Sequence, residues 1–173
     1  MEPKRNLRTY IDLIRWALQL HILTKTEAEH VLRESKRQDK QADDVLKSAW
    51  QFQDMIYRIF SNYIDHKNPQ VRDLEMLNRA LSEALLYQRI KSKSGEFQWV
   101  WEDQEIRLDR MLWPVLRSTA DLLTSERLHQ VKKCEGCGWL FLDNNNGTRR
   151  WCTMSVCGNR AKARRHYARA CHS

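Results

Sequence analysis

The chain contains the stretch Cys134-Glu-Gly-Cys137, followed after 14 residues by Cys152-Thr-Met-Ser-Val-Cys157. Two close cysteine pairs on either side of a short loop are typical of a tetrahedral zinc site, because each pair presents two thiolates about 2.3 Å from one ion. Glycines flank Cys137 on both sides and let the backbone turn tightly there. Four protein ligands leave no open coordination position, so the sequence predicts a structural Zn²⁺ ion held by Cys134, Cys137, Cys152 and Cys157.

Two alternative roles for these cysteines fit the pattern less well. Single intracellular cysteines are often ordinary buried residues, but four of them in two spaced pairs favour a metal site. A redox pair at Cys134 and Cys137 would open a helix in a βαβ unit, whereas the residues that follow, Trp139-Leu-Phe-Leu142, are strand-like. Neither Cys171 nor the histidines at 129, 166 and 172 improve on the two close pairs, and we do not predict them as ligands.

The composition is that of a helical globular protein. Of 173 residues, 42% are hydrophobic and 30% charged, with only 5 Gly and 3 Pro, which excludes collagen-like, low-complexity and disordered classes. The N-terminal residues lack the unbroken apolar core of a signal peptide, and no stretch approaches the roughly 18 apolar residues of a membrane span. We therefore expect a cytoplasmic protein without a membrane partner, in which cysteines bind metal rather than form disulfides.

Cysteines and basic charge both gather near the C-terminus. Residues 134–173 hold seven Lys or Arg side chains against two acidic ones, and the first 133 residues contain no cysteine. This division predicts a helical domain over residues 1–128 and a zinc finger over residues 129–173. The expected fold class is mainly α, with a small β-hairpin in the N-terminal domain and a treble-clef-like finger.

Apolar residues recur at spacings of three and four in the N-terminal domain, which predicts amphipathic helices over 10–18, 45–63 and 74–85. A capping box at Thr24 and Glu27, or at Thr26 and Glu29, opens a short helix between the first two. The Asn68-Pro69 pair is expected to end the long helix, because the residue before a proline disfavours helical geometry.

The segment from Ile90 to Glu102 differs, because aromatic residues alternate there after a Ser94-Gly95 turn signal. This alternation predicts a small hairpin. A last helix carries leucines from Leu108 to Leu122, and Pro114 either kinks that helix or marks its start.

Within the finger, Asn144-Asn-Asn-Gly147 is a turn signal, which is expected to pair the strand at 139–143 with residues 149–151. Good helix formers then run from about Ser155 to Ala170, with Cys157 in the first turn. We expect Ala163, Tyr167 and Ala170 to pack on that hairpin.

The final helix is basic without any acidic residue after Cys157, whereas salt-bridged surface helices mix their signs. Lys and Arg side chains neutralise phosphates, so DNA is the expected partner. The predicted contacts are Arg149, Arg150, Arg160, Lys162, Arg164, Arg165 and Arg169. An acidic protein docked on the same surface, RNA stacked on Trp139 and Trp151, and a homodimer stay open as alternatives. No nucleophile, paired-carboxylate or phosphate-loop motif stands out, so we expect no enzyme.

The finger resembles a known family. Residues 134–169, above all Arg150-Trp-Cys152 and Cys157-Gly-Asn-Arg160, resemble the CGNR zinc finger. Members of that family join the finger to a helical ABATE domain, which the segments 10–17 and 120–123 resemble, and are described as stress-induced bacterial transcription regulators. The resemblance thus implies a zinc finger and a role in transcription. Members commonly begin with a further Leu-Asp-Phe-Val-Asn-Thr-like stretch, and this sequence opens after it, so we expect an abbreviated N-terminal domain.

Two residues of the finger motif have competing roles. We expect Asn159 to brace the knuckle by a hydrogen bond. For Arg160, contact with a phosphate and bracing of the knuckle are equally expected roles.

Overall fold

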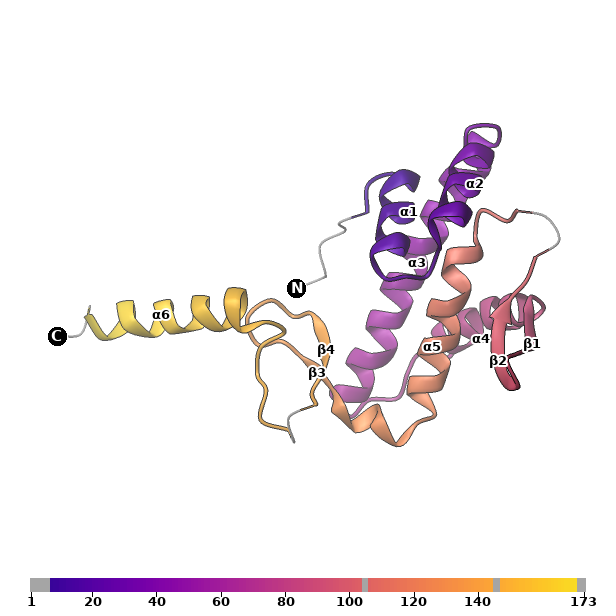
Figure 1. Cartoon of the computed structure of the whole chain (residues 1–173). Helices are drawn as coiled ribbons and strands as arrows, with labels where there is room; N and C mark the ends of the chain where they lie inside the picture. Colours follow the sequence, from indigo (N-terminus) through magenta and orange to yellow (C-terminus); the bar gives the residue numbers. More distant parts are fainter. Residues whose placement is uncertain (1–6, 104–105, 145–146, 171–173) are drawn as a thin grey trace.

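The computed structural model describes residues 7–103, 106–144 and 147–170, and for residues 165, 166 and 168–170 it describes the backbone only. Helices dominate, as the fold class predicted, and Figure 1 shows α1 to α5 as one body with a hairpin on one side and the finger on the other. The elements in chain order are α1 (Tyr10–Gln19), α2 (Lys25–Ser35), α3 (Asp39–Ile64), α4 (Val71–Leu85), β1 (Gln88–Lys93), β2 (Glu96–Trp101), the 3-10 helix η1 (Arg110–Leu112), α5 (Trp113–Leu123), the 3-10 helix η2 (Glu126–Gln130), β3 (Val131–Lys133), β4 (Leu140–Leu142), the π-helical turn η3 (Met154–Gly158) and α6 (Asn159–Ala170).

The start of α2 settles which capping box operates. The Glu27 backbone N–H donates to the Thr24 hydroxyl over 3.2 Å, and the Thr24 N–H donates to the Glu27 carboxylate over 2.7 Å. Thr24 is therefore the N-cap, and two otherwise unpaired amides at the helix start are satisfied by side chains. Thr26 lies inside the helix.

The long helix α3 ends at Ile64, earlier than the Asn68-Pro69 pair that we expected to end it. His66 has a φ of 55°, in the left-handed region, which breaks the helix before the proline is reached. The Lys67 N–H then donates to the Asn62 carbonyl over 2.8 Å and closes the helix end. Pro114 lies in the first turn of α5, so it marks the start of that helix and does not kink it.

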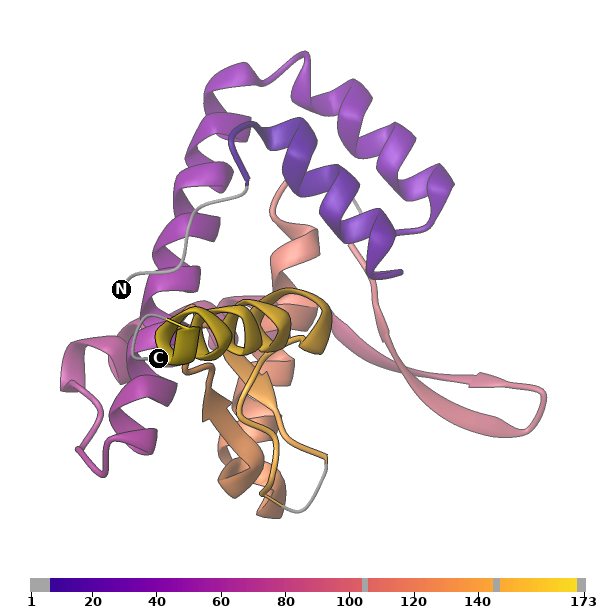
Figure 2. The same ribbon diagram turned by 90° about the vertical axis from the view of Figure 1, so that its left-hand side faces the viewer.

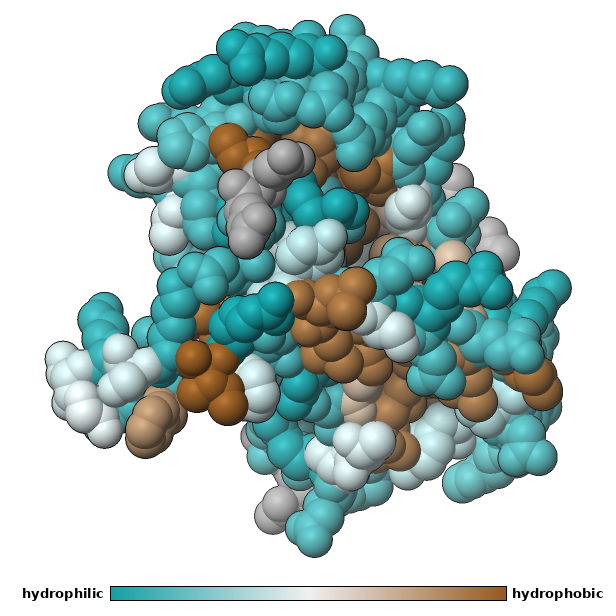
Figure 3. Space-filling view, turned by 90° about the vertical axis from the view of Figure 1, so that its right-hand side faces the viewer, coloured by the Kyte–Doolittle hydropathy of each residue, from teal (hydrophilic) through white to brown (hydrophobic). Residues whose placement is uncertain are grey.

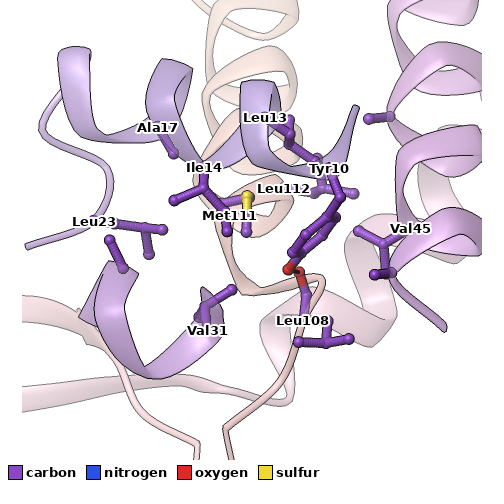
Figure 4. Close-up of a cluster of buried hydrophobic side chains, with 13 residues drawn as sticks. Tyr10, Leu13, Ile14, Ala17, Leu23, Val31, Val45, Leu108, Met111 and Leu112 are labelled. Carbon is purple, nitrogen blue, oxygen red and sulfur yellow. Dashed lines mark hydrogen bonds between the residues drawn. The ribbon is translucent and has the colours of Figure 1, made fainter. Parts of the chain in front are cut away.

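Two hydrophobic clusters lie along α3. The first joins α1, α2 and the start of α3 to the segment 108–112, and the Tyr10 hydroxyl donates to the Leu108 carbonyl over 2.6 Å inside it (Figure 4). The second packs the C-terminal half of α3 against α4 and α5 around Met55, Ile59 and Trp113. The finger contributes no buried residue to either cluster among the described residues, so the helical body has a core of its own.

The predicted hairpin is present as β1 and β2, with Gln88 opposite Trp101 and Lys93 opposite Glu96. Ser94 and Gly95 have φ values of 53° and 85°, which suits a two-residue turn that needs left-handed geometry at both positions. The hairpin projects from the helical body (Figure 2). Figure 3 shows the face of the molecule from which the hairpin projects, and hydrophobic residues gather there within a largely hydrophilic surface. On the hairpin itself, Phe97 is 80% exposed.

The finger is also built on a hairpin, but not on the one that we expected. β4 pairs with β3, with Val131 opposite Leu142, and the predicted pairing of 139–143 with 149–151 is wrong. The turn of the real hairpin is the cysteine knuckle itself, because the Cys134 N–H donates to the Trp139 carbonyl over 2.8 Å and extends the ladder. Residues 145 and 146 of the turn signal lie outside the described residues.

The last helix, α6, leads away from the rest of the molecule (Figure 1). Ala163 is exposed and Tyr167 is 70% exposed, so the expectation that these two residues pack on the hairpin is wrong, while the side chain of Ala170 lies outside the described part of the chain. The predicted domain boundary at residue 128 falls inside η2 and stays a prediction. Among the described residues, no helix combines the length and the apolar character that crossing a bilayer requires.

Candidate metal centre

The β3–β4 hairpin places the first cysteine pair. The Gly138 N–H donates to the Cys134 carbonyl over 2.8 Å, which closes a tight loop around Cys137. Gly138 has a φ of 78°, a conformation that favours glycine. The loop therefore holds Cys134 and Cys137 close together at the tip of the hairpin.

The second pair arrives on the returning chain. The Glu135 N–H donates to the Arg150 carbonyl over 3.2 Å and fastens this chain beside the knuckle. Cys157 lies in the η3 turn that leads into α6. A Cβ atom on Gly136 would lie 3.3 Å from the Cys157 Cβ, so the knuckle and the start of α6 approach closely at a residue without a side chain.

The four sulfur atoms lie within 4.8 Å of one another. The Sγ atom of Cys152 is 3.6 Å from the Sγ atoms of both Cys137 and Cys157, far beyond the length of a disulfide bond. Tetrahedral zinc with Zn–S bonds of about 2.3 Å separates its sulfurs by about 3.8 Å, close to this spacing. Cys134 and Cys157 are buried and the other two are half-buried. The predicted ligand set is thus positioned to hold one structural zinc ion.

The environment of the thiols differs from one cysteine to the next. Burial raises the pKa of the Cys134 thiol, but the backbone N–H groups of Cys152, Gly136 and Cys137 outweigh it and lower this pKa to about 6. Burial and the neighbouring thiols raise the pKa of Cys157 to about 12. Zinc binds thiolates, so ion binding must release the protons that their raised pKa values keep on Cys152 and Cys157 at neutral pH.

Arg149, one of the predicted DNA contacts, is engaged within the finger. Its Nε atom donates to the Trp151 carbonyl over 2.8 Å, and its Nη2 atom donates to the Cys152 carbonyl. The guanidinium carbon lies 4.8 Å from the centre of the Phe141 ring. The side chain therefore braces the segment that carries Cys152, a role that the charge pattern did not indicate.

Asp143 is a structural residue that the sequence pattern did not reveal. It is 2% exposed, accepts a hydrogen bond from the Arg149 N–H over 3.3 Å and lies 3.4 Å from the Lys132 ammonium. A lone aspartate before an asparagine-rich turn gives no sequence signal of burial. Asn159 donates from its side-chain amide to the Ser155 carbonyl over 3.1 Å, a contact within the turn that leads into α6, and its expected bracing of the knuckle stays a prediction.

Three of the predicted contact residues converge on one groove of about 270 Å³. Arg150, Arg160 and Arg164 line it together with Trp151 and Glu135. The Arg150 guanidinium donates to both carboxylate oxygens of Glu135, over 2.7 and 2.5 Å. We call this surface the arginine groove.

The remaining basic residues of α6 are not among the described lining of this groove. Lys162 is exposed but does not line the arginine groove, as far as the described lining residues show. Arg165 and Arg169 lie in α6, and their side chains are outside the described part of the chain, as is Cys171.

Comparison with known proteins assigns the chain to families. No curated protein matches it. Residues 130–170 match the family model of the CGNR zinc finger. Residues 2–126 match the ABATE model, whose description is "Putative stress-induced transcription regulator". The ABATE match covers most of the chain, and the CGNR match contains all four cysteines of the metal centre. The chain therefore belongs to the ABATE family and carries a CGNR zinc finger at its C-terminal end.

Proposed function

We propose that this protein is a DNA-binding transcription regulator whose finger, a treble clef in our interpretation, contacts the phosphates of the duplex. The observation that carries the proposal is the convergence of Arg150, Arg160 and Arg164 on one groove beside the metal centre. Arginine side chains bind phosphate oxygens by charge-assisted, often bidentate hydrogen bonds. The ABATE match supports the regulatory part.

The charge of α6 adds to this support. Its sequence holds four arginines and one lysine and no acidic residue, so nothing on the helix itself competes with phosphate for the basic side chains. The helix also leads away from the helical body, which leaves room for a duplex beside it (Figure 1). Four cysteine ligands leave zinc no open position for substrate, so we propose a binding protein rather than an enzyme.

Fluorescence anisotropy with a labelled duplex at several salt concentrations tests the proposal. The double variant Arg160→Gln/Arg164→Gln should lose about tenfold in affinity and flatten the log–log salt slope by about 2, because two phosphate contacts are removed. Arg15→Gln/Arg37→Gln is the matched control, since both side chains are about 70% exposed and lie on the helical body.

The control variant also loses two positive charges, so its DNA affinity and salt slope should change only by the small effect of the lower net charge. An equal loss in both double variants would mean that only overall charge matters. Absence of any salt-dependent binding to duplex would reject the proposal and leave an acidic protein partner as the next candidate for the same surface.

A further inference from the structure

A second candidate site lies where the helical body meets the finger. A half-open cavity of about 340 Å³ is lined there by residues of α1, α3, α5 and the β3–β4 hairpin. Its walls include Trp16, Phe52, Gln53, Tyr57, Val115 and Trp139. Its volume is at the lower end of the range of about 300–1,000 Å³ that small-molecule sites occupy.

The lining has an unusual chemistry for so charged a chain. Charged residues make up 30% of the sequence, yet the described lining contains no Asp, Glu, Lys, Arg or His. Aromatic rings supply several walls, and Gln53 offers an amide among apolar neighbours. A charged ligand would lose its hydration without gaining an ion partner here, which is strongly unfavourable. An uncharged molecule with one or two aromatic rings matches these walls.

The segment of the chain that precedes the cavity is a poor occupant. Leu7 lines the cavity, and the residues before it include Glu2, Lys4 and Arg5. Their charged side chains would need partners that the described lining lacks. The chemistry of the cavity therefore favours a small molecule over the neighbouring chain.

One wall of the cavity belongs to the finger, and this connects the cavity to the metal centre. Trp139 is 39% exposed, and its carbonyl accepts the hydrogen bond from the Cys134 N–H. From α3, the Tyr57 hydroxyl donates to the carbonyl of the neighbouring Gly138 over 3.2 Å. A molecule in the cavity would touch α3 and the knuckle at once, so its binding energy depends on how the finger sits against α3.

We propose that this cavity binds an uncharged aromatic small molecule and that its occupancy changes the affinity of the finger for DNA. The second half rests on the proposed function, whereas the binding itself does not. Linkage makes the effect reciprocal, so DNA must change the affinity for the molecule by the same factor.

The uncharged dye N-phenyl-1-naphthylamine is a suitable probe, because its fluorescence rises in apolar surroundings. The full chain with zinc should bind it saturably at one site. Val115→Phe fills the cavity and should weaken binding about tenfold. Val71→Phe makes the same change on a side chain that is 71% exposed on α4, and should leave binding unaltered. The charged analogue 8-anilinonaphthalene-1-sulfonate, which adds one sulfonate to the same ring system, should bind at least about tenfold more weakly.

Trp139 provides a second variant that is not expected to disturb folding, because its side chain is partly exposed. Trp139→Ala should weaken dye binding severalfold, while Trp139→Phe should keep most of it, since the aromatic wall remains. Saturating dye should also shift the DNA dissociation constant about fivefold in the parent chain and not in Val115→Phe.

Several results would overturn the proposal. The site is wrong if the dye shows no saturable binding, or if Val115→Phe and Val71→Phe bind it equally. A concentration-dependent dimer that Val115→Phe dissociates would assign the cavity to a second copy of the chain. Dye binding without any effect on DNA affinity would remove the regulatory half. If the chain binds no DNA at all, the proposed function fails, and the dye titration still decides the site.

Discussion

The Arg58 guanidinium donates to both carboxylate oxygens of Asp73, over distances between 2.7 and 3.2 Å. Asp73 is 1% exposed in the first turn of α4, whereas Arg58 on α3 keeps part of its side chain in solvent. The pair fastens α4 against the C-terminal half of α3, beside the cluster of Met55 and Ile59. A buried carboxylate depends on its partner much more than a half-exposed guanidinium does.

Removing the arginine should therefore cost more than removing the aspartate. Arg58→Ala leaves the Asp73 carboxylate buried and unpaired, and we expect a loss of about 3–5 kcal/mol in the free energy of unfolding. Asp73→Ala removes the buried charge itself and leaves only the half-exposed Arg58 guanidinium, which solvent reaches, so the loss should be about 1–2 kcal/mol. Urea denaturation followed by circular dichroism measures both.

The double variant completes the cycle and should be more stable than Arg58→Ala alone, because no buried charge remains. Asp44→Ala removes the partner of an exposed ion pair with Lys47 and should leave the urea midpoint unchanged. Equal losses for Arg58→Ala and Asp73→Ala would contradict this role of the pair.

Removal of zinc should unfold the finger and leave the helical body folded. The two hydrophobic clusters draw no buried residue from the finger in the described part of the chain, so they do not need the ion. Structural zinc contributes about 10–16 kcal/mol in isolated zinc-finger peptides, more than forty residues gain from a small core.

A chelator titration followed by hydrogen exchange distinguishes the two parts. The amides of β3, β4 and η3 should lose protection, whereas those of α3 and α5 should keep it. Cys152→Ser should mimic the chelator and lower the zinc content well below one ion per chain. Cooperative loss of protection in α3 together with the finger would show that the helical body depends on the metal.

Zinc affinity should fall as the pH falls, because protons compete with the ion for the thiolates. The pKa of Cys134 is lowered to about 6, so this thiol is already deprotonated at neutral pH. The pKa of Cys152 is raised, and that of Cys157 is raised to about 12, so these thiols must lose protons when zinc binds. Between pH 6 and 9 the zinc dissociation constant should drop by at least about two powers of ten per pH unit, one for each proton that Cys152 and Cys157 release.

Competition with a chromophoric zinc chelator at several pH values measures that slope. Below pH 6 the slope should steepen by about one as Cys134 also takes up a proton. A slope near one would mean that most of the thiols are already ionised in the metal-free chain.

The sequence predicts the structure well where the signal depends only on residues that are close together along the chain. The paired cysteines and the Ser94-Gly95 turn act locally and are present as predicted, and the Thr24–Glu27 capping box is one of the two that the sequence left open. The strand at 139–143 was predicted to pair with the residues after the turn at Gly147. It pairs with β3 instead, so both strands of the finger hairpin lie before Gly147 in the sequence. The turn signal at Gly147 is as strong as that of the cysteine knuckle, and the sequence did not distinguish them. A local turn signal shows that the chain reverses direction, but it does not determine which two strands pair.

Long-range pairing accounts for the remaining differences. Nothing near Asp73 in the sequence marks it as buried, since its partner lies 15 residues away on another helix. Arg149 has the same charge as Arg150, yet its guanidinium is used by the carbonyls around Cys152 and that of Arg150 by Glu135. The sequence alone does not distinguish these two arginines. Their contacts in the folded finger show that Arg149 braces the metal centre and that Arg150 lines the arginine groove.

Glu135 should act as a competitor of phosphate for Arg150. Its carboxylate holds the guanidinium that lines the arginine groove, and Arg150 lowers the pKa of Glu135, so the acid stays ionised at neutral pH. A DNA phosphate must displace this carboxylate to reach Arg150. Glu135→Gln should therefore tighten DNA binding by about two- to fivefold, the range expected for an exposed ion pair, and should steepen the salt slope because Arg150 becomes an additional phosphate contact.

Glu126→Gln is the matched control, because Glu126 is an exposed acid in η2, outside the described lining of the arginine groove. It changes the net charge equally but leaves the Arg150 pair intact, so the difference between the two variants isolates the competition. Anisotropy titrations of both variants at two salt concentrations give that difference. If Arg150→Gln abolishes the gain produced by Glu135→Gln, the acid acts through Arg150. Equal affinities for Glu135→Gln and Glu126→Gln would show that Glu135 contributes only to the overall charge.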